Sequence, residues 1–486
     1  MAEAFRVEHD SLGEVNVPKH AYYGANTMRA VENFPITGNP IDRRFIRAIV
    51  EVKKAAALMN YEVHQLNEKR TKAIVASCDR ILAGENMDQF VVDPIQGGAG
   101  TSFNMNVNEV IANMATESLG GALGSYHPVH PNDHVNEGQS TNDVIPTAGK
   151  IAMIRYFVDL KEEAKKLNAA FEKKSREFDS YIKMGRTQNQ DAVPIRLGQE
   201  FAAYTAVLER DVKRFDAAIE ALSVVNLGGT AIGTGLNADV NYVKNIVPKL
   251  NEVTGLSLVQ SADLIDGTQN LDGFLFASSV LKNYAISLSK IANDLRFLSS
   301  GPRSGIHEIT LPARQAGSSI MPGKVNPVIP EVVNQMAFAV VGNDMTVTMC
   351  VEGGQLELNA FEPVCFYKIF ESLRGLRGAI YTFRVHCIEG LVANKKSLEE
   401  EVQRSVGIVT ALAPHIGYET ASRLAKTALA TNKSLRDLVL EEKLMSEKKL
   451  DRIFNPYEMT HPGIAGKEED EPAHEHGEED YPVKKS

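Results

Sequence analysis

The residues best suited to chemistry stand together in the segment QAGSSIMPGKVNP, at positions 315–327. Ser318 and Ser319 offer hydroxyl groups, Lys324 a cation and Asn326 an amide. The glycines and prolines between them prevent a regular helix or a central strand, so the segment is predicted to be a loop.

This loop is predicted to lead into the N-terminus of a helix. Proline is tolerated in a first turn, and Pro330 is followed at helical spacing by Val333, Ala337 and Val340. A helix N-terminus carries unpaired N–H groups and a partial positive charge, and both favour a bound anion.

A nucleotide phosphate loop is excluded, although Gly323 and Lys324 have the right types. Gly317 lies one residue too far upstream for the G-x-x-x-x-G-K spacing, and Val325 occupies the position of the magnesium-binding Ser or Thr. The anion is therefore expected to be something other than a nucleotide phosphate.

Segments rich in Gly, Ser, Thr and Asn recur along the chain, and each taken alone indicates no more than a turn. They are QGGAGTSFNMN (96–106), NDHVNEGQSTND (132–143), MGRTQNQD (184–191) and LGGTAIGTGLN (227–237). The glycine-rich ones lack the third glycine and the preceding strand of a dinucleotide-binding fingerprint. His130 and His134 have metal-like spacing, but Pro131 intervenes and no HExxH glutamate is present, so the pair is interpreted as structural or as a weak anion site.

Long helices are predicted to position these segments. One apolar stripe at alternating spacings of three and four comprises Leu281, Tyr284, Leu288, Ile291, Leu295 and Leu298. Similar stripes run through 160–171 and 201–222. A helix over 271–299 would be about 40 Å long at about 1.5 Å per residue, which is typical of a long-helix bundle.

Composition and charge narrow the class of protein. The chain has 486 residues, of which 43% are hydrophobic, as expected for a globular protein with a large core. A net charge of −10 and the absence of a basic stripe argue against nucleic acid as a partner. No apolar run is long enough to span a membrane and the first ten residues do not resemble a signal peptide, so the protein is predicted to be cytoplasmic.

The cysteines and the C-terminal residues carry no predicted chemistry. Cys78, Cys350, Cys365 and Cys387 are far apart in the sequence and are expected to be reduced and mostly buried. Residues 467–486 hold eight acidic side chains and three lysines and are predicted to form a disordered, solubilising tail.

The polar segments and GSSIMPGKVNP resemble, in content and order, the aspartase/fumarase superfamily of lyases, from AYYGANTMRAVENF at 21 to NPYEMTHPGIAG at 455. The resemblance implies a mainly α, three-domain fold: a mostly helical N-terminal domain (1–141), a central long-helix bundle (142–396) and a small helical C-terminal domain (397–466). It also implies a homotetramer whose active sites each draw loops from three subunits.

Within the superfamily, QGGAGTS (96–102), KMGRTQ (183–188) and QSTND (139–143) resemble the members that deaminate aspartate more than the class II fumarases. The resemblance then implies reversible loss of ammonia from L-aspartate to give fumarate. Fumarases have histidine at the position of Gln188, where hydration needs a group that handles a water proton. An aspartate ammonium already carries its proton, so glutamine suffices.

The resemblance also assigns roles to single residues. The β-carboxylate of the substrate, which becomes a doubly charged aci-carboxylate when the Cβ proton leaves, would be bound by Thr101, Ser140, Thr141 and Ser319. The α-carboxylate would be held by Thr187, Met321 through its backbone, Lys324 and Asn326, and the amino group would face Asn142 and Gln188. Glu331 is expected to be structural, and Asn189 departs from the family pattern.

Ser318 matches the general base of the family. A serine hydroxyl is a weak base, so this role requires an oxyanion stabilised by loop N–H groups, a helix terminus and Lys324. No cofactor is required on this resemblance, although Mg²⁺ activates some members. Two alternatives stay open: a fumarate hydratase, and a catalytically idle relative kept as a structural or partner-binding protein, against which the intact set of site residues argues.

Overall fold

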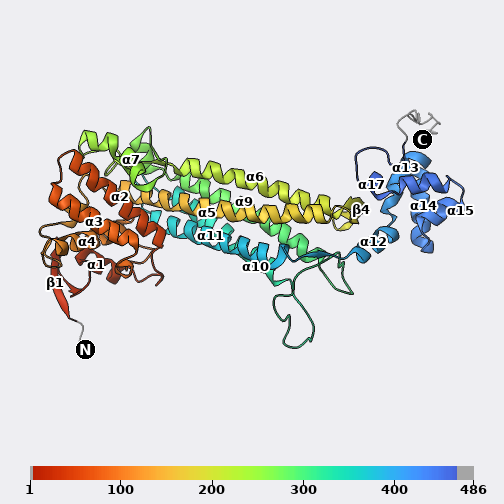
Figure 1. Ribbon diagram of the computed structural model, residues 1–486, viewed down its shortest axis with the longest axis horizontal. Coiled ribbons are helices and arrows are strands. Elements are labelled where there is room, and N and C mark those ends of the chain that lie inside the picture. The colour runs from red at the N-terminus through yellow and green to blue at the C-terminus, as the bar shows by residue number, and fades with distance from the viewer. Residues whose placement is uncertain (1–3, 468–486) are drawn as a thin grey trace, which may run out of the picture. The chain divides into compact units, whose positions relative to one another are not determined.

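Helices dominate the computed structural model, which describes residues 4–467 (Figure 1). All but the first residue of the predicted acidic tail lies outside the described residues. Every sheet in the described part has only two strands: β1–β2, β3–β4 and β7–β8 are antiparallel, and β5–β6 is parallel. The mainly α fold expected from the sequence is confirmed.

The chain forms two compact units, each built from segments that are distant in sequence. The first unit comprises residues 4–169, 206–294 and 313–387 of the described chain, and the second comprises 170–205, 295–312 and 388–467. The three-domain division expected from the sequence stays a prediction.

The first unit consists of helices and two small sheets. Its elements are β1 (Phe5–Asp10), β2 (Gly13–Pro18), α1 (Ala25–Asn33), α2 (Arg43–Glu62), α3 (Glu68–Ala83), α4 (Thr101–Ser118), β5 (Val224–Val225), α7 (Val240–Thr254), β6 (Val259–Gln260), α8 (Leu264–Gln269), α10 (Val328–Glu352) and α11 (Glu362–Phe383). Three further helices contribute residues to both units: α5 (Thr141–Glu177), α6 (Leu197–Leu222) and α9 (Asp272–Leu298).

Long helices pack against one another in the first unit, as the apolar stripes predict. Phe215 of α6 contacts Phe157 of α5 and Tyr284 of α9, with ring centroids 5.9 and 5.0 Å apart. Ser278 of α9 donates a hydrogen bond to Asp344 of α10 at 2.8 Å. The predicted helix over 271–299 corresponds to α9, and its six stripe residues are all buried. The long-helix bundle is confirmed.

The second unit has its own core. Its elements are β3 (Ile182–Thr187), β4 (Gln190–Arg196), β7 (Ile309–Thr310), β8 (Val392–Ala393), α12 (Lys395–Arg404), α13 (Val409–Ile416), α14 (Tyr418–Thr431), α15 (Leu435–Glu441), α16 (Glu447–Ile453) and α17 (Pro456–Met459). Short amphipathic helices bury leucines at its centre, among them Leu412, Leu424 and Leu438. No helix between residues 4 and 467 combines the length and the apolar character that crossing a membrane requires.

Candidate active site

Two helices of the first unit begin at residues that the sequence marks as substrate ligands. Thr101 opens α4 and Thr141 opens α5. The two helix starts are linked, because Asn104 in the first turn of α4 donates a hydrogen bond from Nδ2 to Thr141 Oγ1 at 3.2 Å. Helix N-termini favour anions, so two of the four predicted ligands of the β-carboxylate lie where an anion is favoured.

A buried carboxylate fixes the turn that precedes α5. Asp143 accepts a hydrogen bond from the backbone N–H of Ser140 at 2.9 Å, and its second oxygen accepts from those of Gly228 and Thr230 at 3.0 and 3.1 Å. Burial raises the pKa of Asp143 to about 6, although these hydrogen bonds act in the opposite direction. The QSTND turn and the LGGTAIGTGLN loop are thereby held together.

Asn142 adds a second link between these segments. Its Nδ2 donates to the carbonyl oxygen of Ala231 at 2.7 Å, and Asn226 donates to the carbonyl oxygen of Asn142 at 3.0 Å. Because the amide N–H group is engaged with the loop, the Asn142 Oδ1 acceptor is left to meet a ligand. An acceptor suits the ammonium group that the sequence assigns to this residue.

Lys53 lies behind these residues and was not anticipated from the sequence. Its side chain is fully buried on α2, and Nζ donates to Asn136 Oδ1 at 2.8 Å and to Gln139 Oε1 at 2.9 Å. Burial lowers the pKa of Lys53 to about 7. The sequence did contain a signal for this residue, since Lys53 stands among the apolar residues of 49–59. A lysine is rarely buried without a specific partner, so such a position indicates a buried polar contact.

The loop that carries Ser318 is exposed and held mainly by its own contacts. Gly317 N–H donates to the carbonyl oxygen of Lys324 at 2.8 Å, and Asn326 Nδ2 donates to the carbonyl oxygen of Gly317 at 2.7 Å. A Cβ on Gly317 would lie 2.2 Å from the Lys324 carbonyl oxygen, so only glycine fits. At the tip, the Ile320 side chain is 83% exposed.

Ser318 has one of the features that a serine base requires. Its Oγ accepts hydrogen bonds from the backbone N–H groups of Ile320 and Met321, at 3.1 and 3.0 Å. Two aligned N–H donors stabilise a negative oxygen. The side chain of Lys324 makes no hydrogen bond or ion pair with the rest of residues 4–467, so it is available to an anion.

The loop and the two helix starts are not joined within one chain. Among the described residues, no hydrogen bond links Ser318 or Ser319 to Thr101, Ser140 or Thr141. The loop leads into α10 as predicted, and Pro330 and Glu331 both lie in its first turn. The predicted residues that belong to the first unit therefore form two separate groups, one around Thr141 and one in the loop.

Thr187 and Gln188 belong to the second unit, at the turn of the hairpin β3–β4. Thr187 pairs with Gln190, and the two residues between them have positive φ, 54° at Gln188 and 60° at Asn189. These values define a two-residue turn of the primed type, in which asparagine is favoured. The unusual Asn189 is thus accommodated by the turn itself.

Ion pairs anchor this hairpin within the second unit. Arg186, next to Thr187, donates to Glu308 and also to Glu401 Oε2 at 2.8 Å. Burial, followed by the neighbouring Glu308, raises the pKa of Glu401 to about 7. Glu308 is fully buried and also pairs with Lys183 of β3 at 2.6 Å. Its charge is balanced by two cations.

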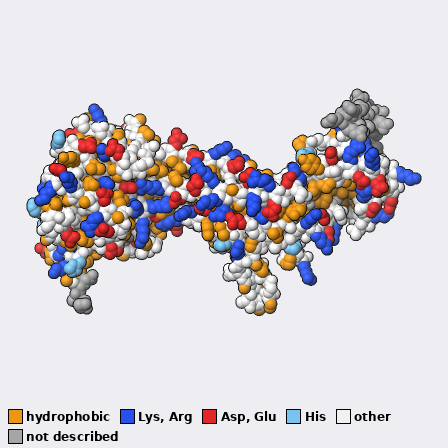
Figure 2. All heavy atoms as spheres, viewed as in Figure 1, with side chains coloured by type: hydrophobic (Ala, Val, Ile, Leu, Met, Phe, Trp, Pro, Cys, Tyr) orange, Lys and Arg blue, Asp and Glu red, His pale blue; other side chains and the backbone are white. Residues whose placement is uncertain are grey.

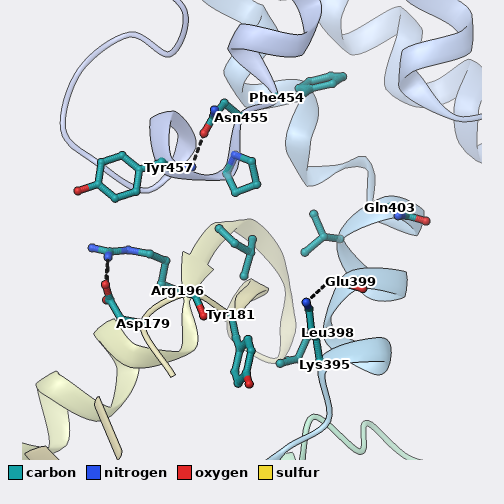
Figure 3. Close-up of a pocket in the computed structure, with 14 residues that line it drawn as sticks. Asp179, Tyr181, Arg196, Lys395, Leu398, Glu399, Gln403, Phe454, Asn455 and Tyr457 are labelled. Atoms are coloured by element: carbon teal, nitrogen blue, oxygen red, sulfur yellow. Dashed lines mark hydrogen bonds and ion pairs between the residues drawn. The ribbon is translucent and has the colours of Figure 1, made fainter. Parts of the chain in front are cut away.

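A cavity of about 620 Å³ lies elsewhere in the second unit (Figure 3). None of the predicted site residues lines it. Its cations are already paired: Arg196 donates to both oxygens of Asp179, and Lys395 lies 3.7 Å from Glu399. Aromatic side chains such as Tyr457 cover part of its wall. Nothing in this lining matches the chemistry of the polar segments.

The remaining reactive side chains have structural roles. The His130 ring accepts from the backbone of Asn132 and Asp133, and the His134 ring accepts from the His130 N–H, as the structural interpretation expects. All four cysteines are free and buried, as predicted. Between residues 4 and 467, no cluster of three or more His, Cys, Asp or Glu side chains is arranged to hold a metal ion.

Comparison with known proteins places this arrangement in a family. Residues 13–342 match the family model described as Lyase, and residues 408–461 match the model described as Fumarase C C-terminus. The aspartate ammonia-lyase of Bacillus subtilis (strain 168) is 52% identical over 464 residues, which is 96% of this chain and 98% of that protein. The aspartate ammonia-lyase of Helicobacter pylori (strain ATCC 700392 / 26695) is 50% identical over 96% of this chain and all of that protein.

Solved structures agree. A fumarate lyase:delta crystallin from Brucella melitensis has a TM-score of 0.92 at 48% identity, covering 94% of this chain and 100% of that one. A class II fumarase from Schistosoma mansoni has a TM-score of 0.91 at 34% identity, with the same coverage. The chain belongs to the aspartase/fumarase superfamily of lyases and, within it, to the aspartate ammonia-lyase family.

Proposed function

We propose that the protein catalyses the reversible deamination of L-aspartate to fumarate and ammonia. The observation that carries this proposal is the match to aspartate ammonia-lyases at about half identity over nearly the full chain. The donors around Thr141 and the acceptor on Asn142 support it, because they suit a substrate that carries both a carboxylate and an ammonium group.

Proton removal from Cβ is the demanding step of this reaction, and Ser318 is the proposed base. Its oxygen is already solvated by two loop N–H groups, which favours the oxyanion form. The electron pair of the broken C–H bond moves into the β-carboxylate, where Thr101, Ser140, Thr141 and Ser319 would donate hydrogen bonds to the aci-carboxylate. Collapse of this intermediate forms the double bond of fumarate and expels ammonia.

The other end of the substrate is proposed to be held by a further set of residues. Lys324, Asn326, the backbone of Met321 and Thr187 are the proposed ligands of the α-carboxylate, and Asn142 and Gln188 those of the amino group. Ammonia leaves with the protons that it already carries, so no general acid is needed. The route involves no redox change and is proposed to need no cofactor, with Mg²⁺ at most an activator.

The same proposal includes a homotetramer in which different subunits complete each site. It would explain why no hydrogen bond joins Ser318 to Thr141 within residues 4–467 of one chain. Apolar side chains also lie open on the surface (Figure 2), and several fall on the long helices α9 and α10: Phe276 (46% exposed), Ile286 (52%), Phe338 (67%), Met345 (63%) and Met349 (67%). Exposed apolar surface of this kind marks a protein interface. The cytoplasmic location stays a prediction.

Absorbance of fumarate in the ultraviolet tests the activity directly. The purified protein is mixed separately with L-aspartate, with L-malate, and with fumarate plus ammonium. We expect fumarate to form from aspartate and to be consumed only with ammonium. Fumarate from malate alone would identify a fumarase instead, and silence in all three mixtures would favour the catalytically idle relative.

A further inference from the structure

Thr141 can bind a carboxylate only if its hydroxyl proton points toward it. A threonine hydroxyl has one donor and two acceptor positions, so its direction depends on its neighbours. The neighbour here is Asn104, whose side chain lies 3.2 Å from Thr141 Oγ1. An amide side chain can turn either its NH₂ group or its carbonyl oxygen toward Thr141 Oγ1, and Asn104 turns its NH₂ group.

The buried ammonium group of Lys53 determines this orientation of Asn104 through Asn136. An ammonium has donors and no acceptor, so Asn136 must turn its Oδ1 toward Lys53 Nζ, 2.8 Å away. The opposite end of Asn136 agrees with this orientation, because Nδ2 donates to the carbonyl oxygen of Gln139 at 3.1 Å. Gln139 Oε1 supplies the second acceptor of the ammonium at 2.9 Å.

The orientation of Asn136 is passed on to Asn104. Asn104 Nδ2 donates to Asn136 Oδ1 at 3.1 Å, and the same NH₂ group donates to Thr141 Oγ1. Rotating the Asn104 amide by a half turn would place its oxygen against Asn136 Oδ1. Thr141 Oγ1 is therefore an acceptor from Asn104, and its own proton remains for a ligand.

Two buried amide oxygens without partners support the view that their neighbours determine how the amides are oriented. Asn104 Oδ1 and Asn108 Oδ1 are both buried and have no hydrogen-bond partner among residues 4–467, while Asn108 Nδ2 also donates to Asn136 Oδ1 at 3.1 Å. Unpartnered buried acceptors are unfavourable. Both amides are oriented in the same way despite this cost, and each NH₂ group donates one hydrogen bond to Asn136 Oδ1, the oxygen that also accepts from Lys53.

We infer that Lys53 is a positioning residue that directs the Thr141 hydroxyl proton toward the substrate through the chain Asn136, Asn104 and Thr141. The inference rests on the proposed function, in which Thr141 donates to the β-carboxylate. When the ammonium is removed, Asn136 and Asn104 can reverse, and Thr141 then donates to Asn104 instead. The aci-carboxylate loses a donor although Thr141 is still present.

A double-mutant cycle in the full-length protein tests the inference. Lys53→Met removes the cation and keeps an apolar stem, and Thr141→Val removes the hydroxyl at constant shape. Loss of one donor to a developing oxyanion lowers kcat about 100-fold or more, so we expect Thr141→Val to lower kcat to that extent and Lys53→Met by about 10-fold or more. The double variant should be no slower than Thr141→Val alone, and KM should change less than kcat.

Lys54→Met is the matched control, since Lys54 is the next residue of α2 and pairs with Asp79 at 2.6 Å instead. Its turnover should equal that of the wild type. If Lys53→Met reduces the yield of folded protein, Asn104→Leu interrupts the same chain without removing the cation, and it should likewise have no added effect in the Thr141→Val background.

The inference would be overturned if Lys53→Met lowered kcat by the same factor in the wild type and in the Thr141→Val variant. It would also be overturned if Lys53→Met had the turnover of the wild type. The wild-type assay separates this failure from failure of the proposed function. Fumarate release from L-aspartate by the wild type together with additive variants rejects the role of Lys53 alone, whereas a wild type that is silent with aspartate rejects both.

Discussion

The residues around Thr141 and the loop around Ser318 differ in how they are held. Asp143 and Lys53 are fully buried and bind their neighbours through several hydrogen bonds. The loop tip at Ile320 is 83% exposed, and the hydrogen bonds that hold the loop run between its own residues. In the proposed reaction the first group binds the charge that develops, and the second removes the proton.

This difference fits the two tasks. Donors that stabilise a developing charge act best when they are already oriented, because no reorganisation is then needed during the reaction. A base that must approach the substrate and exclude water is better carried by a segment that can close. Substitution of the proposed site residues in the loop should therefore affect turnover with little change in stability, and substitutions behind Thr141 should affect both.

Ser318→Ala should have the largest effect on turnover. Loss of a general base lowers kcat about 100-fold or more, and we expect this loss at an unchanged thermal midpoint because the loop is exposed. The measurement is fumarate release from L-aspartate alongside a thermal melt. Val325→Ala, at another exposed side chain of the loop, is the control and should keep its activity. Turnover close to the wild type in Ser318→Ala would remove the serine from the mechanism.

The contrast also shows which features a sequence can reveal. The loop and the helix after it are local consequences of glycine, proline and helical spacing, so their positions at 315–327 and from Pro330 are predictable. The stripes of α9 are predictable for the same reason. The family resemblance supplied the roles proposed for Ser318 and Thr141, which no local pattern could supply.

The support behind Thr141 was not predictable in this way. Lys53, Asn104 and Asn136 lie on three segments that meet only in the folded chain, and each taken alone is an ordinary polar residue of a helix or turn. The turn at Gln188 and Asn189 depends on the pairing of β3 with β4, which polar residues alone do not indicate. Such features depend on long-range contacts.

Asn136→Leu should have the second largest effect of these substitutions. The quantity that it changes is the free energy of unfolding. It removes the acceptor of Lys53, Asn104 and Asn108 together. A buried polar group left without its partner costs about 1–3 kcal/mol, so we expect the free energy of unfolding to fall by about 3 kcal/mol in urea titrations.

Asn245→Leu is the matched control for this substitution. Asn245 is exposed on α7, and its side chain donates to the carbonyl oxygen of Asn241, one turn earlier. Exposed substitutions of this kind usually change stability by less than about 0.5 kcal/mol. Equal stability of the two variants would mean that the amides behind Thr141 are no more constrained than a surface residue.

The smallest effect concerns pH and tests how thoroughly the group around Thr141 is buried. Burial raises the pKa of Asp143 to about 6 from an ordinary value of 3.8. Between about pH 4 and pH 6 the folded chain therefore holds more protons at this group than the unfolded chain. The stability contributed by Asp143 is then present at low pH and is lost as the pH rises toward 6.

Asp143→Asn removes this titration, so the difference in unfolding free energy between the wild type and the variant should decline with rising pH. The limit is about 1.4 kcal/mol per pH unit, measured by urea titration at pH 4, 5 and 6. Asp239→Asn, at the N-cap of α7, is the control, because asparagine and aspartate cap helices about equally well. A difference that stays constant over this range would mean that the hydrogen bonds from Ser140, Gly228 and Thr230 offset the burial of Asp143, and that this carboxylate acts electrostatically like one at the surface.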